Sequence, residues 1–210
     1  MYKKYIKLLL DYIISIIACV ILMPLFLIVS ILIKLEDKGP IFYFANRIGQ
    51  NSKKYNMIKF RSMKVNATDI RNIDGSTYNS NKDPRVTRTG KLLRETSIDE
   101  IPQIINVLKG EMSLIGPRAS TWDALNSFQA DEVDKMKVKP GISGYTQAYY
   151  RNGVSLRDKR LKDAWYANNV SFILDMRIFL KTIFTVINRE NIYTNSKVDA
   201  ETNKHDKTTD

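Results

Sequence analysis

An uninterrupted apolar run near the N-terminus constrains this chain more than any other feature. From Tyr12 to Ile33 the sequence contains no charged residue. About 20 apolar residues are enough for a helix to cross the hydrocarbon core of a bilayer. The run is also longer than the apolar region of about 7–15 residues in a cleaved signal peptide, so we expect it to be retained. The sequence therefore predicts a polar body that one hydrophobic helix holds at a membrane.

Pro24 lies in the middle of this run, and basic residues flank it on both sides. A proline inside a helix removes a backbone hydrogen bond and kinks the helix. Positive charge marks the cytoplasmic side of a membrane segment, and here it stands at both ends: Lys3, Lys4 and Lys7 before, Lys34 and Lys38 after. A re-entrant helix that enters and leaves on the cytoplasmic face explains both features. A single-pass anchor with an incidental proline is the alternative.

Charge and composition narrow the classes of partner. The chain has 33 Lys and Arg against 22 Asp and Glu, a net charge of +11. A basic domain of this kind can bind anionic lipid headgroups or phosphorylated substrates. Attraction to an anionic membrane contributes about 1 kcal/mol per basic residue near the surface. Nucleic acid is another common partner of basic domains, but the membrane helix argues against it. The only histidine is His205 and the only cysteine is Cys19, which excludes His-ligated zinc and an intrachain disulfide.

The pattern of elements predicts an α+β fold in which a small, helix-rich domain follows the apolar helix. We assign residues 1–38 to the re-entrant helix and its flanks, 39–188 to this domain and 189–210 to a polar tail that we expect to be disordered. Periodicity and turn signals predict strands at 41–44 and 55–63, a turn at 47–50, a surface loop at 66–83, and helices at 90–108 and 121–136. An apolar helix starting near Ser171 suits either the membrane interface or the core.

Two adjacent carboxylates, Asp99 and Glu100, form the first candidate site. Ser97 and Glu100 have the spacing of a capping box, so the simplest interpretation is the start of a helix. If Asp99 is the N-cap instead, Pro102 falls in the first turn, where its missing N–H costs nothing. Adjacent carboxylates could also share one Mg²⁺ ion together with substrate phosphates. From the residues alone, the cap and the metal site both stay open.

Basic residues on turn-rich segments surround this pair. Segment 83–91 (DPRVTRTGK) precedes it and segment 114–118 (LIGPR) follows it, while two further cations lie on the preceding strand. One basic loop is typical of a solvated face. Several around an acidic pair, with Gly and Pro fixing the loops, favour bidentate phosphate binding. The candidate phosphate-binding residues are Lys59, Arg61, Arg85, Arg88 and Arg118.

Taken together, these segments resemble the bacterial sugar transferase family, the monotopic phosphoglycosyl transferases or polyprenyl-phosphate sugar-1-phosphate transferases. The likeness runs from Lys3 to about Arg189. Its motifs are the proline-broken helix, RIG (47–49), KFRSM (59–63), DPRVTRTG (83–90), RETSIDEIPQ (94–103), GEMSLIGPR (110–118) and KPGISG (139–144). Two positions depart from the family pattern. Ala119 stands where a second proline is usual, and segment 144–150 lacks a tryptophan before Gln147.

The resemblance implies a mechanism and a location. Asp99 would attack the sugar-bearing phosphorus of a UDP-sugar and release UMP, Glu100 would hold Mg²⁺ with Asp99, and polyprenyl (undecaprenyl) phosphate would accept the sugar phosphate. This is a priming step in exopolysaccharide, capsule or glycan synthesis, on the cytoplasmic face of the bacterial inner membrane. The resemblance also implies the re-entrant form of the helix and interfacial amphipathic helices. The alternatives are a membrane-tethered protein that binds anionic lipid without turnover and a glycosyltransferase that releases UDP.

Overall fold

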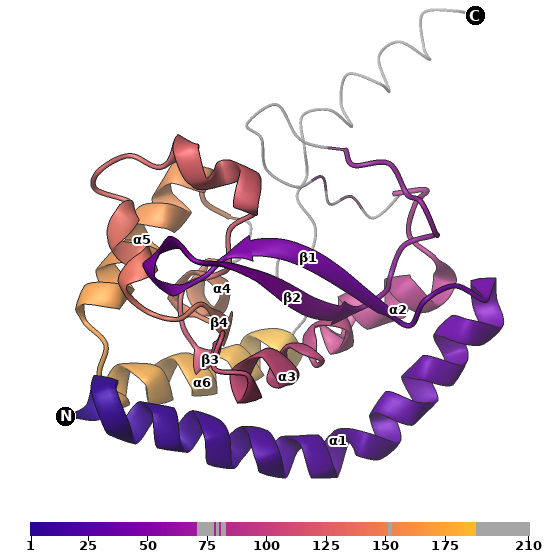
Figure 1. The fold of residues 1–210 in the computed structure, drawn as a ribbon, viewed down its shortest axis with the longest axis horizontal. Coiled ribbons are helices and arrows are strands. Elements are labelled where there is room, and N and C mark those ends of the chain that lie inside the picture. Colours follow the sequence, from indigo (N-terminus) through magenta and orange to yellow (C-terminus); the bar gives the residue numbers. More distant parts are fainter. Residues whose placement is uncertain (71–77, 79, 81–82, 151–152, 188–210) are drawn as a thin grey trace, which may run out of the picture.

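The computed structural model describes residues 1–70, 78, 80, 83–150 and 153–187, and within them it has an α+β fold (Figure 1). The longer helices and the strands are α1 (Lys7–Asp37), β1 (Phe42–Ile48), β2 (Lys54–Phe60), α2 (Arg88–Glu95), α3 (Gln103–Leu108), β3 (Ser113–Ile115), β4 (Gly141–Ser143), α4 (Tyr145–Tyr149), α5 (Leu156–Asn168) and α6 (Phe172–Ile187). Short π or 3₁₀ turns are η1 (Tyr2–Ile6), η2 (Gln50–Ser52), η3 (Ile98–Glu100), η4 (Trp122–Ser127) and η5 (Val133–Lys137). The tail 189–210 and part of the loop 66–83 lie outside the described residues.

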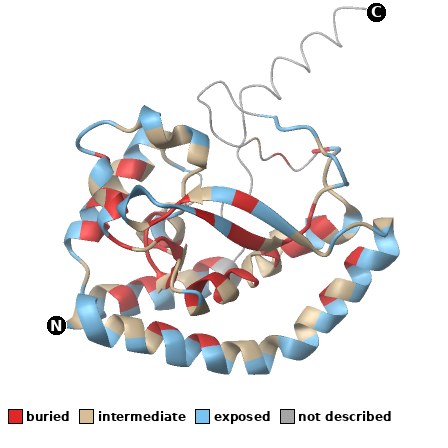
Figure 2. Cartoon of the chain, viewed as in Figure 1, coloured by how far each residue is buried: buried red, intermediate tan, exposed pale blue. Residues whose placement is uncertain are grey.

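The apolar run forms α1, a bent helix that follows one side of the domain (Figure 1). With η1 it is long and apolar enough to cross a membrane, and only 11% of its most apolar window is buried (Figure 2). Both ends nevertheless contact the same domain. Lys7 pairs with Asp175 on α6 at 2.6 Å, and Asp37 pairs with Arg61 just after β2. Both ends of the helix therefore lie against the same folded domain.

The two strands that the sequence predicts pair as an antiparallel hairpin, with Phe42 opposite Phe60. Their ends differ from the prediction. β1 continues through Arg47 and Ile48, so the expected turn at 47–50 begins only at Gly49. β2 stops at Phe60, before the expected end at residue 63. The hairpin carries Lys59 towards the centre of the domain.

The single helix expected at 90–108 is wrong, because the chain breaks twice. α2 ends at Glu95, Ser97 adopts a left-handed conformation (φ 59°), and the η3 turn follows before α3 begins. A left-handed residue cannot continue an α-helix, and Pro102 lacks the N–H that a continuous helix would use. The segment expected at 121–136 is also not an α-helix. It forms the 3₁₀ turns η4 and η5, and Thr121 makes no side-chain cap.

α6 begins one residue after the predicted start, at Phe172, and turns an apolar face outward. Phe172, Ile173, Phe179 and Leu180 are about half to two-thirds exposed. Its inward side buries Ile178 together with the carboxylate of Asp175. This distribution is opposite to that of a water-facing helix, where apolar residues face the core. α6 lies beside the N-terminal part of α1, so the exposed apolar surfaces of both helices adjoin (Figure 1).

Candidate active site

Asp99 and Glu100 form the η3 turn between α2 and α3. The preceding Ile98 packs against a core cluster that α1, β2 and α2 share, with Val29, Phe60 and Leu93 buried in it. The side chain of Ser97 makes no capping hydrogen bond, and α3 starts only after Pro102. The capping-box interpretation is therefore wrong for Ser97. The two carboxylates are held by the packing of the turn.

Glu100 is held between two cations from distant parts of the chain. Lys59 Nζ on β2 donates to Glu100 Oε1 at 2.6 Å, and Arg118 Nη2 lies 3.5 Å from the same oxygen. Burial by itself would raise the pKa of Glu100, but Lys59 and then Arg118 outweigh it and lower the pKa to about 2. Glu100 is therefore a stable anion at the centre of a cationic site.

Asp99 has the opposite environment. Only 9% of it is exposed, and among the described residues its carboxylate accepts no hydrogen bond. Burial, the largest cause, and the charge of Glu100 raise the pKa of Asp99 to about 6, against the lowering effect of Lys59. A buried carboxylate without hydrogen bonds is poorly stabilised as an anion. It is correspondingly available to bond with an electrophile.

The other predicted phosphate-binding residues lie further from this pair. Arg61 is 7% exposed and makes a bidentate pair with Asp37, with Nη1 at 2.6 Å from Oδ2. Arg85 is bound by Asp83, with Nη2 at 2.6 Å from Oδ2. The side chain of Arg88 is exposed at the start of α2. Of the five predicted cations, the structure brings Lys59 and Arg118 to the acidic pair.

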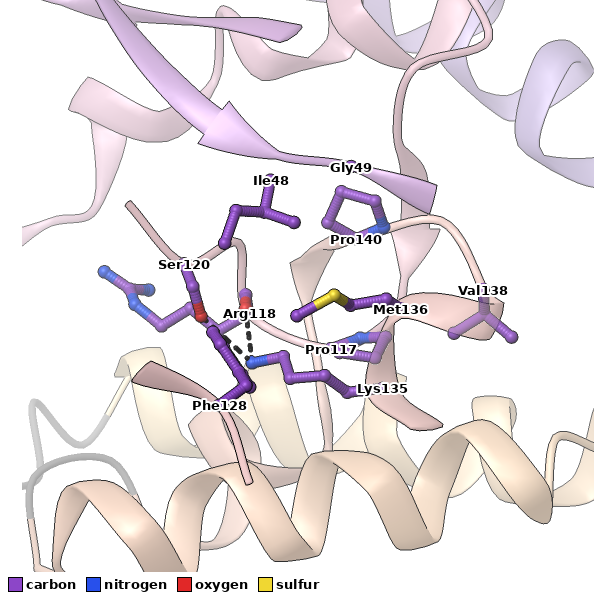
Figure 3. Close-up of a pocket in the computed structure, with 10 residues that line it drawn as sticks. All are labelled: Ile48, Gly49, Pro117, Arg118, Ser120, Phe128, Lys135, Met136, Val138 and Pro140. Atoms are coloured by element: carbon purple, nitrogen blue, oxygen red, sulfur yellow. Dashed lines mark hydrogen bonds between the residues drawn. The ribbon is translucent and has the colours of Figure 1, made fainter. Parts of the chain in front are cut away.

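The loop that carries Arg118 is closely supported. A Cβ atom on Gly116 would lie 2.5 Å from the carbonyl oxygen of Lys139, so only glycine fits this approach. Pro117 is fully buried. Behind the loop, in a small pocket, Lys135 Nζ donates to the carbonyl oxygen of Arg118 at 3.0 Å, while the guanidinium group points away from it (Figure 3). Ala119 packs against a neighbouring core cluster.

Sequence reasoning did not single out Lys135, which is 7% exposed and also pairs with Asp163 at 2.9 Å. A lysine in a polar segment is predicted to lie on the surface, because Lys is almost never fully buried unless it is paired. Its partner Asp163 lies on α5, 28 residues away. The spacing of the motifs therefore gave no signal for this support of the Arg118 loop.

Comparison with known proteins matches the chain to one family. The model of the bacterial sugar transferases covers residues 2–189. The chain belongs to the bacterial sugar transferase family. An undecaprenyl-phosphate N-acetylgalactosaminephosphotransferase that uses UDP-N-acetylgalactosamine, from Aeromonas hydrophila, is 39% identical over 189 residues, which is 87% of this chain and 44% of the relative. The undecaprenyl-phosphate galactose phosphotransferase of Salmonella typhimurium is 34% identical over 203 residues, 91% of this chain and 42% of the relative.

Shorter members of the sugar transferase family match over most of their length. The uncharacterized sugar transferase EpsL of Bacillus subtilis is 38% identical over 169 residues, covering 80% of this chain and 81% of the relative. In contrast, the chain spans less than half the length of the Aeromonas and Salmonella proteins. The apolar helix α1, Asp99, Glu100 and Arg118 all lie within the residues that the family model matches.

The carboxylates of Asp99 and Glu100 are ligands of the kind that Mg²⁺ uses, but the ion would need further ligands such as substrate phosphates. Among the described residues no group of three or more His, Cys, Asp or Glu side chains could hold a metal by itself. The one hydrogen bond that Glu100 accepts in this part of the chain uses Oε1, so Oε2 and the Asp99 carboxylate remain for a cation. Mg²⁺ often binds through one or two carboxylates plus substrate phosphates and keeps several waters.

Proposed function

We propose that this protein transfers a sugar 1-phosphate from a UDP-sugar to polyprenyl (undecaprenyl) phosphate and releases UMP. The observation that carries the proposal is the contrast between the two adjacent carboxylates. Glu100 is paired with Lys59 and Arg118, while Asp99 is buried and accepts no hydrogen bond from the residues that the structure describes. Adjacent carboxylates with such different environments suit different roles. Asp99 is then the nucleophile, and Glu100 organises charge around the transferred phosphate.

In the first half-reaction, a carboxylate oxygen of Asp99 forms a bond to the sugar-bearing phosphorus. The bond from this phosphorus to the bridging oxygen breaks, and UMP leaves with the electron pair. The product on the protein is an aspartyl-phosphosugar, a known type of intermediate for carboxylate nucleophiles. The poor stabilisation of the Asp99 anion by its surroundings favours attack.

In the second half-reaction, a phosphate oxygen of polyprenyl phosphate attacks the same phosphorus. The bond to Asp99 breaks, the carboxylate is restored, and a polyprenyl-diphosphate sugar forms. The side chain of Arg118 is 55% exposed and lies beside Glu100. Its guanidinium group can therefore bind the phosphates of the leaving UMP and of the incoming lipid without moving away from Glu100. Arg88, exposed at the start of α2, is a second candidate for a phosphate contact.

Mg²⁺, when bound, would neutralise the charge on the phosphates of the donor, and Asp99 and Glu100 are the residues that would hold it. The protein's own cations share this task. Lys59 is 16% exposed and is committed to Glu100, so its contribution is to hold that carboxylate in place and ionised. Arg118 is the more accessible of the two cations.

The helix α1 is proposed to be re-entrant, with both ends on the cytoplasmic face of the inner membrane. Contacts of both ends with one domain support this topology, since a straight spanning helix would separate its ends by the hydrocarbon thickness of about 30 Å. Pro24 lies within the bent helix and is the proposed cause of the bend. The exposed apolar faces of α1 and α6 would then lie in the membrane interface and bring the site to the lipid phosphate.

The decisive experiment withholds the lipid acceptor. Purified protein is incubated with a UDP-sugar and Mg²⁺, and intact-protein mass spectrometry measures whether a phosphosugar is attached. The proposal expects an adduct on the wild type and none on Asp99→Asn, which keeps the shape but loses the anion. Absence of an adduct on wild type, with sequential kinetics, would remove the covalent step and leave Asp99 as a metal ligand or general base.

A panel of UDP-sugars with polyprenyl phosphate and Mg²⁺ separates this function from its alternatives. Release of UMP supports phosphosugar transfer, and release of UDP would identify a glycosyltransferase. A protein that binds anionic lipid without turnover would release neither. The names of the Aeromonas and Salmonella relatives favour UDP-N-acetylgalactosamine and UDP-galactose as the first donors to test.

A further inference from the structure

The η1 turn and the N-terminal half of α1 carry a stripe of polar side chains that contact the domain. Its members, spaced four residues apart, are Lys3, Lys7, Asp11 and Ser15. Residues four apart lie on the same face of a helix. Asp11 is 6% exposed and Ser15 is fully buried, while Ile13, Ile14, Ile16 and Ile17 are exposed. This half of the membrane helix therefore docks on protein through polar groups.

Asp11 makes the most specific of these contacts. Ser113 Oγ donates to Asp11 Oδ2 at 2.7 Å, and the backbone N–H of Leu114 donates to Asp11 Oδ1 at 3.1 Å. Both donors belong to β3, and Ser113 is itself 1% exposed. Asp11 thereby provides an acceptor for a backbone N–H of β3. The contact lies four residues before Arg118, and the rigid Gly116–Pro117 segment connects them.

The C-terminal half of α1 is fixed to the other side of the site. Asp37 holds Arg61, which follows Lys59 by two residues. Glu36 accepts the first two backbone N–H groups of α2, from Arg88 at 2.7 Å and Thr89 at 3.0 Å. A carboxylate at this position is stabilised by the dipole of the helix. α2 leads directly into the turn that carries the acidic pair.

Each half of α1 thus contacts a segment that lies a few residues from one of the two cations around Glu100. Its N-terminal half holds the strand that leads to Arg118, and its C-terminal half holds the strand that carries Lys59 (Figure 1). We infer that α1 is a brace that sets the spacing of Lys59 and Arg118, and that Asp11 is a positioning residue for Arg118. The effect of Asp11 on catalysis rests on the proposed function, but the structural role of α1 as a brace does not depend on it.

Hydrogen–deuterium exchange on the full chain in lipid nanodiscs tests the brace without any substrate. Asp11→Ala should raise exchange in peptides that cover 113–118 and leave 54–60 near the wild-type rate. Asp37→Ala should give the reverse pattern. Ser15→Ala is the matched control, because Ser15 lies on the same stripe and, in the described residues, its hydroxyl has no hydrogen-bond partner. Unchanged exchange at 113–118 in Asp11→Ala would overturn the inference.

A double-mutant cycle tests positioning in the reaction. Asp11→Ala should lower kcat/KM for the UDP-sugar by about 10- to 100-fold, the range expected when a group is displaced by about 1 Å. In an Arg118→Ala background the same change should cost only about twofold, because the two residues act through one contact. A loss of equal size in both backgrounds would show a general structural effect and overturn the positioning role.

A second variant covers the case in which Asp11→Ala does not fold. Ser113→Ala removes the hydroxyl partner and leaves α1 unchanged, so it should show a smaller loss with the same dependence on Arg118. Independence from Arg118 would again refute positioning. If the wild type releases no UMP from any UDP-sugar, the proposed function fails, while the exchange measurement still decides whether α1 is a brace.

Discussion

Replacing Asp99 by Asn should make the metal-free protein more stable, although it should abolish turnover. Most substitutions of buried polar residues destabilise a protein, so this direction is diagnostic. The reason is that the surroundings of Asp99 disfavour its charge and raise its pKa from 3.8 to about 6. Asn has nearly the same shape and carries no charge. The neighbouring substitution, Glu100→Gln, should have the opposite effect.

The magnitudes follow from the two pKa values. Each pKa unit is worth about 1.4 kcal/mol, so ionised Asp99 lowers the free energy of unfolding by about 3 kcal/mol at neutral pH. The pKa of Glu100 lies near 2 rather than 4.5, because Lys59 and Arg118 outweigh its burial. Loss of that charge should therefore cost up to about 3 kcal/mol. Part of this loss is offset, since Glu100→Gln also removes a negative charge next to Asp99.

The pH dependence has a defined sign for each residue. The folded pKa of Asp99 is raised, so the native state binds more protons between about pH 4 and pH 6 and stability falls as pH rises through this window. The advantage of Asp99→Asn should grow from near zero below pH 4 to its full value above pH 6. The folded pKa of Glu100 is lowered, so its contribution is present above about pH 4.5 and is lost towards pH 2.

Thermal unfolding in detergent with EDTA measures these effects in the absence of metal. For a domain of this size, about 1 kcal/mol moves Tm by roughly 2–4 °C, so Asp99→Asn should melt about 6–12 °C above wild type at pH 8. A Tm at or below that of the wild type would refute the reasoning about the environment of Asp99. A structural capping role predicts a Tm close to that of the wild type for Asp99→Asn, because Asn caps a helix about as well as Asp, and a loss of about 0.5–2 kcal/mol for Asp99→Ala.

Three further predictions concern the cations and the membrane helix. Arg118→Ala should lower kcat/KM for the UDP-sugar by a factor that corresponds to about 1.5–3 kcal/mol, as expected for the loss of a hydrogen bond to a charged group. Arg85→Ala should lower kcat/KM less, because Asp83 binds the guanidinium group of Arg85. Equal losses for the two variants in steady-state kinetics would contradict this ranking. Cysteines placed at Lys4 and Lys38 should both react only with reagent on the cytoplasmic side, and periplasmic labelling at Lys4 would exclude the re-entrant topology. Pro24→Leu should straighten α1, and the same labelling should then detect a fraction of spanning molecules.

The sequence by itself determined the local features of this protein. The apolar run predicts a helix that could lie in lipid, because exposing its residues to water carries a large free-energy cost. The adjacent Asp99 and Glu100, the basic motifs around them and the two strands of the hairpin were also recognisable along the chain. Each of these signals lies within a few residues, where periodicity and composition are informative.

Only the tertiary structure decided which of these groups meet. Lys59 contacts Glu100 across 41 residues, and Asp11 contacts Ser113 across 102. Arg61 has the same charge as Arg118, yet it is bound by Asp37 at the C-terminal end of α1. The different roles of Asp99 and Glu100 also arise there. Adjacent carboxylates are equivalent along the chain. Their pKa values separate because folding places Glu100 against Lys59 and Arg118, whereas burial is the largest effect on Asp99.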